Sequence, residues 1–222
     1  FAKRFAEEAS KLKTGNPFKK VFSSSGDPGC VGWEDYVPNE DVYYGPIINE
    51  QGYEKVAKYN RMVMNDRDAE VLLEGKRLNG GDFGMAGDAR GCYMSPMVYK
   101  TEWRGVEAPY LRDEVFGPHV AIIPFDTLED AINIYNDTDY GLAVGVLTND
   151  FRKARILRDE CDAGMIYWNG GSIAAESHLA FGGVKKSGNG FPSAARTFRA
   201  VTHEISWTVN YADRLTFPQG MK

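Results

Sequence analysis

Apolar and polar residues follow one another through residues 120–168 in a pattern that predicts strands and helices in turn. Residues 120–123, 142–147 and 164–168 are apolar runs, and the first is continuous, as expected for a strand covered on both faces. Residues 127–135 and 150–161 instead place apolar side chains three and four positions apart, which is typical of one helical face. Strand, helix, strand, helix, strand with short connections indicates a parallel sheet built from right-handed crossovers. We therefore predict an α/β fold.

Two side chains mark where these helices begin. Thr127 is followed three positions later by Asp130, close to a capping box, and Asp150 is a favoured N-cap residue. The apolar positions of the two helices are Leu128, Ala131, Ile132 and Tyr135, and then Phe151, Ala154, Leu157 and Cys161.

Amphipathic patterns are also present at both ends of the chain. Phe1, Phe5, Ala9 and Leu12 line one face of a predicted helix. Residues 201–209 alternate strictly between apolar and polar, which predicts a strand with one buried face. An unpaired terminal strand is an exposed edge, so we expect it to have a partner. That partner is either a neighbouring subunit or another strand of the same domain.

The composition is that of a chain able to bury a core. Of 222 residues, 43% are hydrophobic and 26% are charged, which is enough for one domain. The net charge of −5 argues against nucleic acid and anionic membranes as partners, and no apolar run is long enough to span a bilayer. The simplest compartment is the cytoplasm.

Cysteine and histidine spacing suggests no metal. Cys30, Cys92 and Cys161 are an odd number at irregular positions, so neither a disulfide framework nor a zinc site is indicated. The three histidines show no ligand spacing. Cys161 falls on the inner face of its predicted helix and is interpreted as an inert core residue.

Residues 114–118 carry a candidate for cofactor chemistry directly before the strand that begins near residue 119. In an extended segment the carboxylate of Glu114 and the ring of Phe116 point to the same side. Gly117 lets the backbone turn tightly, and Pro118 stiffens the exit. Such a pair offers oxygens to vicinal ribose hydroxyls and a ring edge to a planar heterocycle. The alternative is a turn that only leads into the strand.

Several motifs together resemble the aldehyde dehydrogenase superfamily. Segments 114–118, 140–143, 163–169 and 181–188 occur in the order and spacing of that superfamily, and the resemblance extends back to segments 15–17 and 45–49. The chain is similar to the C-terminal half of such an enzyme. The resemblance implies a parallel-sheet α/β domain of this type over residues 1–200, followed by an oligomerisation strand and tail over residues 201–222.

This resemblance implies an NAD- or NADP-dependent oxidation of an aldehyde to a carboxylic acid through a cysteine thioester. The nucleophilic cysteine and the general-base glutamate of the family are expected upstream of Phe1, so no catalytic residue is expected here. The chain opens inside a helical pattern, and we expect it to be inactive without an N-terminal half. Glu114 is expected at the nicotinamide ribose and Phe116 beside the ring.

The substrate pocket implied by the resemblance is formed by Asn169 and the loop that leads to Phe181. Glu176, Ser177 and His178 make this wall polar, which suits an aldehyde with a charged or hydroxylated tail; simple solvent exposure is the alternative. The implied partners are a small aldehyde, the N-terminal half of the same enzyme and further copies in a homo-oligomer.

The sequence leaves open the role of two loops and a second candidate function. Loops at residues 23–29 and 80–91 depart from the family pattern, and either shape a substrate entrance or an oligomer contact or reflect neutral variation. A second function also fits, namely a non-catalytic module that keeps the fold and the oligomer contacts without redox activity.

Overall fold

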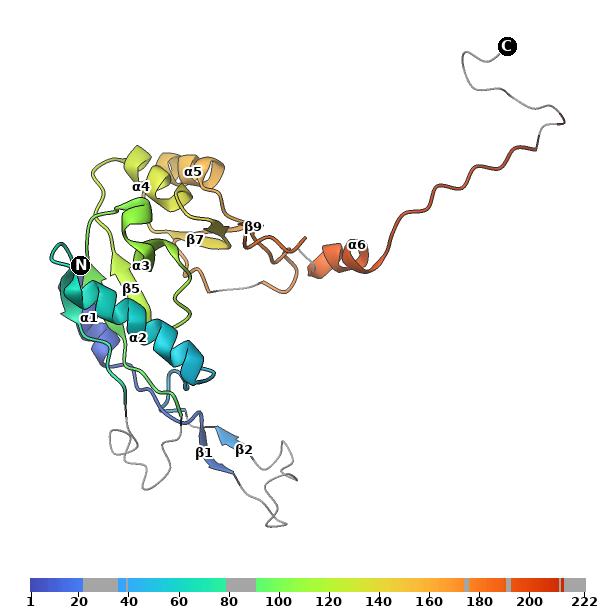
Figure 1. The fold of residues 1–222 in the computed structure, drawn as a ribbon. Helices are drawn as coiled ribbons and strands as arrows, with labels where there is room; N and C mark the ends of the chain where they lie inside the picture. Colours follow the sequence, from blue (N-terminus) through green and yellow to red (C-terminus); the bar gives the residue numbers. More distant parts are fainter. Residues whose placement is uncertain are drawn as a thin grey trace. The chain divides into compact units, whose positions relative to one another are not determined.

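A computed structural model gives the architecture of the chain (Figure 1). The structure describes residues 1–21, 36–38, 40–78, 91–173, 176–190, 193–211 and 213. The 23–29 loop, residues 80–90 of the second loop and Cys30 lie outside these residues. The chain divides into two compact units, Phe1–Thr138 and Asp139–Lys222, which are described separately.

The first unit is built on a mixed three-stranded sheet. β4 (Met97–Lys100) is its central strand, antiparallel to β3 (Glu70–Leu73) and parallel to β5 (His119–Ile122). β5 confirms the predicted strand at residues 120–123, although it begins one residue earlier. β4 was missed by the sequence analysis, yet Met97, Val98 and Tyr99 are all fully buried.

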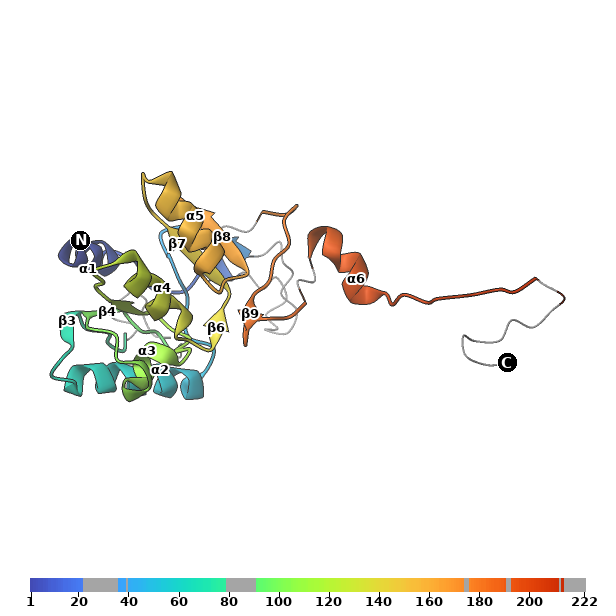
Figure 2. The same cartoon turned by 90° about the horizontal axis from the view of Figure 1, so that it is seen from above.

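Helices cover both faces of this sheet, as Figure 2 shows for the labelled elements. α2 (Glu50–Asn65) packs Tyr53, Val56 and Val63 into a cluster that includes Met97 and Tyr99. α1 (Ala2–Ser10) packs against the opposite face, where Val98 points, because successive strand residues alternate between faces.

The helix predicted at the start of the chain is confirmed, but its buried face shares only Ala9 with the face that Phe1, Phe5 and Leu12 line. Ala6 and Ala9 are buried beside Val98, whereas Phe1 is 92% exposed and Phe5 and Leu12 are more than one third exposed. Small alanine side chains allow the helix backbone to approach the sheet closely, so the helix is rotated relative to the face that its large side chains suggested.

Further short elements complete this unit. β1 (Phe18–Val21) and β2 (Tyr36–Pro38) form an antiparallel pair. A 3₁₀ turn, η3 (Gly105–Glu107), leads into α3 (Pro109–Arg112). α4 (Leu128–Asn136) begins with the predicted capping box, since the side chains of Thr127 and Asp130 each accept from the other's backbone N–H.

The second unit contains the second of the two predicted crossovers, whereas β5, the first strand of the predicted parallel sheet, pairs with β4 in the first unit. β7 (Ala143–Val146) and β8 (Met165–Trp168) are parallel and are joined by α5 (Phe151–Glu160). Asp150 caps α5 by accepting from the amides of Arg152 and Lys153, as expected. On the predicted inner face of α5, Ala154 and Cys161 are buried, but Phe151 is 55% exposed.

Glycines allow the motif segments of this unit to pack backbone against backbone. β6 (Tyr140–Gly141) pairs antiparallel with β9 (Val184–Lys185). A Cβ atom at Gly164 would lie 2.0 Å from the carbonyl oxygen of Gly182, and one at Gly141 would lie 2.2 Å from that of Asp162. Only glycine fits at these two contacts.

The predicted terminal strand is not formed within the described part of the chain. η4 (Ala194–Arg196) leads into α6 (Thr197–Val201), so Val201 is helical, and residues 202–211 belong to no helix or strand (Figure 1). Ile205 is 78% and Trp207 87% exposed. Pairing inside the domain is therefore not seen among these residues, and pairing with another subunit stays a prediction.

Candidate functional site

The segment between α3 and β5 presents Glu114 and Phe116 outward. Both residues are exposed, whereas Val115 between them is only 8% exposed and belongs to the main hydrophobic cluster. The backbone carbonyl of Glu114 accepts a hydrogen bond of 2.6 Å from Nζ of Lys55. The carboxylate and the ring thus face away from a fixed backbone.

The turn in this segment is made at Phe116 and not at Gly117, which corrects the sequence analysis. Phe116 has φ +59°, a left-handed conformation that costs a bulky side chain on the order of 1 kcal/mol or more. Gly117 is required for a different reason. A Cβ atom there would lie 2.6 Å from Cγ2 of Val56 on α2, so the glycine allows close packing.

The exposed pair has the chemistry that a nicotinamide nucleoside needs. No hydrogen bond to the carboxylate of Glu114 is recorded within the described residues, so its two oxygens remain available for vicinal hydroxyls. The ring of Phe116 is 75% exposed and can flank a planar heterocycle. The residues present therefore fit the cofactor that the motif predicted.

A polar cluster lies behind this segment at the start of β5. Nδ1 of His119 is 2.8 Å from Oδ1 of Asn60, and Nε2 is 2.9 Å from the hydroxyl of Tyr99. Because Oδ1 only accepts, Nδ1 carries the proton and Nε2 accepts from Tyr99. Burial lowers the pKa of His119 from 6.5 to about 4, so the ring is neutral at neutral pH.

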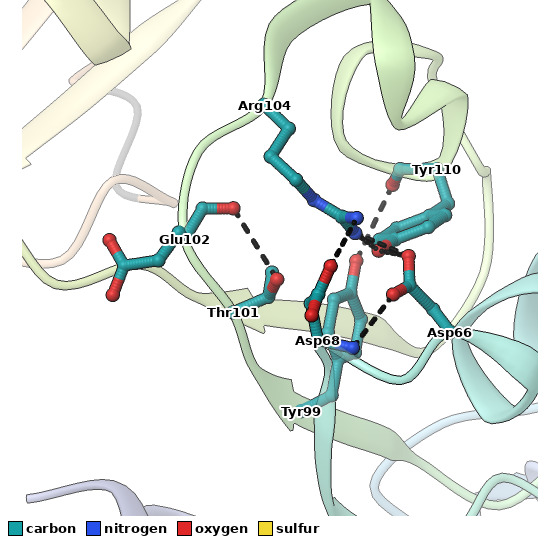
Figure 3. Close-up of polar contacts among 7 residues, drawn as sticks. All are labelled: Asp66, Asp68, Tyr99, Thr101, Glu102, Arg104 and Tyr110. Carbon is teal, nitrogen blue, oxygen red and sulfur yellow. Dashed lines mark hydrogen bonds and ion pairs between the residues drawn. The ribbon is translucent and has the colours of Figure 1, made fainter.

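A second cluster closes the C-terminal end of α2 (Figure 3). The guanidinium of Arg104 contacts Asp66 and the Tyr110 hydroxyl, and that hydroxyl donates to Oδ2 of Asp66 at 2.7 Å. Asp68 lies 3.4 Å from Nη1 of Arg104. The hydrogen bond from Arg104 is the main cause that lowers the pKa of Asp66 to about 2. Burial is the main cause that raises the pKa of Tyr110 to about 12.

In the second unit, Asn169 follows β8 with φ +53°, a conformation that asparagine tolerates better than most residues. Its Oδ1 accepts from the amide of Thr148 at 2.9 Å, and its Nδ2 donates to the carbonyl of Thr148 at 3.1 Å. The side chain therefore ties the ends of β7 and β8 together. Its predicted place in a substrate pocket stays a prediction.

The same unit contains a cavity of about 180 Å³ beside β8. Glu176 and Phe181 both line it, so two predicted pocket residues meet at one cavity. Ser177 and His178 are exposed and are not among its lining residues. The full lining is Gly164, Met165, Ile166, Tyr167, Glu176, Leu179, Ala180 and Phe181.

Comparisons with known proteins agree with the motifs. The sequence profile of the aldehyde dehydrogenase family matches residues 1–206. The chain belongs to the aldehyde dehydrogenase family. It is 30% identical over 148 residues to the α-ketoglutaric semialdehyde dehydrogenase of Bacillus subtilis, an alignment that covers 67% of this chain and 29% of that protein.

Solved structures of similar proteins share the fold. The betaine aldehyde dehydrogenase of Staphylococcus aureus, solved in complex with NAD⁺, has a TM-score of 0.65 and 25% identity, over 84% of this chain and 32% of its own. HpcC of Thermus thermophilus has a TM-score of 0.66 and 28% identity, over 84% and 31%. The predicted aldehyde dehydrogenase-type α/β fold is confirmed. The chain spans about a third of the length of these relatives.

The described cysteines of this aldehyde dehydrogenase chain are both buried. The thiol of Cys92 donates to Oε2 of Glu50 at 3.2 Å, and burial raises the pKa of both Cys92 and Cys161. A raised pKa disfavours the thiolate, which is the nucleophilic form. Within the described residues no group of three His, Cys, Asp or Glu side chains is arranged to hold a metal. No helix described here has the length and apolar character needed to cross a membrane.

The residues that support the aldehyde dehydrogenase motifs were missed by the sequence analysis. Asn60 and Tyr99 contact His119 across 59 and 20 residues of sequence, and Lys55 contacts Glu114 across 59. No local pattern links such positions. A signal did exist on α2, where polar Asn60 interrupts a buried apolar stripe.

Proposed function

We propose that this chain supplies the nicotinamide-facing and substrate-facing parts of an NAD(P)-dependent aldehyde dehydrogenase, as the C-terminal half of its catalytic part. The observation that carries the proposal is the exposed pair of Glu114 and Phe116 on a strained segment whose backbone is held from behind. Left-handed conformations at bulky residues persist where the surrounding structure enforces them, and they cluster at binding sites.

This chain and the rest of the enzyme have different roles in the proposed reaction. In such a reaction a cysteine thiolate would add to the aldehyde carbonyl, and water would hydrolyse the thioester that remains after oxidation to give the acid. Bound NAD or NADP supplies the hydride acceptor. Glu114 binds the ribose hydroxyls, and Phe116 flanks the ring. Burial raises the pKa of the Cys92 and Cys161 thiols, which makes both poor nucleophiles and supports a nucleophile from outside this chain. We propose that the general base also comes from outside it.

The aldehyde is expected to meet the second unit. The cavity lined by both Glu176 and Phe181 supports a largely apolar pocket with one acidic side chain. Asn169, Ser177 and His178 do not line this cavity, and we propose them as further parts of the pocket wall, which suits a substrate with a charged or hydroxylated tail.

The proposal extends to organisation and assembly. Residues 1–200 form the catalytic-domain part, and residues 201–222 form the strand and tail that join subunits of a cytoplasmic homo-oligomer. The exposed apolar side chains of Ile205 and Trp207 support this role.

An activity assay tests the proposal. The 222-residue chain and the full enzyme that carries it are each supplied with NAD or NADP and a panel of aldehydes, and the formation of reduced cofactor is followed by its absorbance. We expect turnover only from the full enzyme. Turnover by the chain alone that is lost in Cys30→Ser, Cys92→Ser or Cys161→Ser would overturn it. A full enzyme that reduces neither cofactor would favour the non-catalytic module.

A further inference from the structure

One face of helix α2 is attached to the segment that carries Glu114 and Phe116. At the start of the segment, the Tyr59 hydroxyl donates to Oδ2 of Asp113 at 2.5 Å. One residue further, Nζ of Lys55 donates to the backbone carbonyl of Glu114 at 2.6 Å. Two side chains one helical turn apart thus hold two consecutive residues of the segment.

The same helix face continues to the end of the segment. Gly117 packs on Val56 so closely that a Cβ atom would lie 2.6 Å from a methyl carbon. Asn60 accepts from Nδ1 of His119 at 2.8 Å. Positions 55, 56, 59 and 60 lie on one side of an α-helix, so they form one continuous support.

Side-chain contacts hold both ends of α2. The N-terminus of α2 is capped by Asn49, whose Oδ1 accepts from the amide of Gly52 at 2.8 Å. Its C-terminal end is held by the contact of Arg104 with Asp66 (Figure 3). Val115 belongs to the hydrophobic cluster that includes residues of α2, and Glu114 and Phe116 on either side of it are exposed.

From this arrangement we infer that α2 is the template that positions the nicotinamide-facing segment, with Lys55 and Tyr59 as positioning residues for hydride transfer. The inference rests on the proposed function of Glu114 and Phe116. Hydride transfer depends steeply on distance and alignment, so a small displacement of this segment slows it without removing a contact to the cofactor.

The test uses Lys55→Met and Tyr59→Phe, singly and together, in the full enzyme. These changes remove the two hydrogen bonds but keep the aliphatic stem and the ring, so the core is retained. Lys3→Met, at an exposed lysine of α1, is the matched control, and Lys55→Arg is the conservative rescue. Rates are normalised to active sites counted by the stoichiometric labelling of the nucleophilic cysteine with a thiol-alkylating reagent that the aldehyde substrate blocks.

We expect the double variant to lower kcat about tenfold, with the KM for the cofactor changed less than about twofold. The primary deuterium isotope effect on kcat, measured with aldehyde deuterated at the carbonyl carbon, should increase because hydride transfer becomes rate-limiting. Amide hydrogen exchange in residues 114–117 should accelerate. Lys3→Met should behave as the parent enzyme, and Lys55→Arg should restore most of the effect of Lys55→Met. If Lys55 and Tyr59 only stabilised the fold, the variants would contain a smaller fraction of active enzyme, and the isotope effect on kcat would be unchanged.

Two results would overturn the inference. Unchanged hydrogen exchange in residues 114–117 shows that α2 does not hold the segment, whatever the segment does. Faster exchange with an unchanged isotope effect shows that its position does not govern hydride transfer. Glu114→Gln in the same assay separates the two proposals: if it lowers kcat, only the inference on α2 fails, and if it has no effect, the proposed function of Glu114 fails as well.

Discussion

His119 and Asn60 form a hydrogen-bonded pair, with Nδ1 of the half-buried imidazole 2.8 Å from Oδ1 of an amide residue that is only 4% exposed. The pair joins the first residue of β5 to the centre of α2. The other ring nitrogen of His119 faces the hydroxyl of Tyr99, whose side chain is fully buried. Protonation of the imidazole would place a hydrogen on Nε2, which could then no longer accept from the Tyr99 hydroxyl. The charged ring would also be poorly solvated.

This pair predicts a dependence of stability on acid pH. Folding lowers the pKa of His119 from 6.5 to about 4, so between these values the unfolded chain binds a proton that the folded chain does not. The stabilisation is fully present above pH 6.5 and is lost as the pH falls toward 4, by about 2–3 kcal/mol. Urea unfolding at several pH values measures the slope. His119→Leu should be less stable, but its free energy of unfolding should depend less on pH between about 4 and 6.5. His203→Gln, at an exposed position, should show the same pH dependence as the parent. An equal slope in parent and His119→Leu would contradict the assignment.

The contact between Gly117 and Val56 predicts a coupled pair of substitutions. Gly117→Ala places a methyl group 2.6 Å from Cγ2 of Val56, and overpacking of this kind costs about 1–3 kcal/mol. In a Val56→Ala background the same change should cost less, because the obstructing methyl groups are gone. A double-mutant cycle by urea unfolding measures the coupling. Gly45→Ala is the control, since its nearest neighbour atom would be 3.6 Å away. Equal costs for Gly117→Ala in both backgrounds would show that the contact is not tight.

The sequence correctly predicted elements whose ends depend only on neighbouring residues. The capping box of Thr127 and Asp130 and the N-cap at Asp150 were predicted and are confirmed, because a cap needs only residues three positions apart. The crossover from β7 through α5 to β8 was predicted for the same reason, since each element has its own apolar period. β4 was missed because its four residues follow a glycine-rich stretch and are too short to show a period.

Features that depend on tertiary contacts were not predicted correctly. The alternation that turns Glu114 and Phe116 outward was anticipated, but the left-handed residue is Phe116 rather than Gly117. The need for glycine at position 117 is set by its contact with Val56, a residue distant in the sequence that no local rule includes. Arg104 and Asp66 are likewise 38 positions apart. The place of Phe1 and Phe5 on the surface also follows from how α1 docks, because the helical period alone allows either face.

Glu114 should act on cofactor positioning in the full enzyme. Glu114→Gln keeps the shape but weakens charge-assisted hydrogen bonds to the ribose hydroxyls. We expect a kcat about tenfold or more lower, with hydride transfer slower and a smaller change in the KM for the cofactor. Steady-state kinetics with protonated and deuterated aldehyde measure this. Glu107→Gln, at an exposed glutamate of η3, is the matched control. Unchanged kcat together with unchanged cofactor KM would reduce Glu114 to a structural residue.

The terminal segment should determine the assembly of the enzyme. In this single chain Ile205 and Trp207 are largely exposed, and their alternation with polar residues predicts one face that a neighbouring subunit covers. Burial of each large side chain contributes roughly 1.5–3 kcal/mol, so Ile205→Ser with Trp207→Ser should weaken the assembly by several kcal/mol.

The core of the second unit should survive, because the pairing of β7 with β8 does not involve this segment. Glu204→Ser with Thr208→Ser alters the alternate positions and should leave the assembly intact. Size-exclusion chromatography with light scattering measures the mass of each variant. A parent enzyme that is already monomeric at micromolar concentration, or equal masses for the two double variants, would show that the segment does not join subunits.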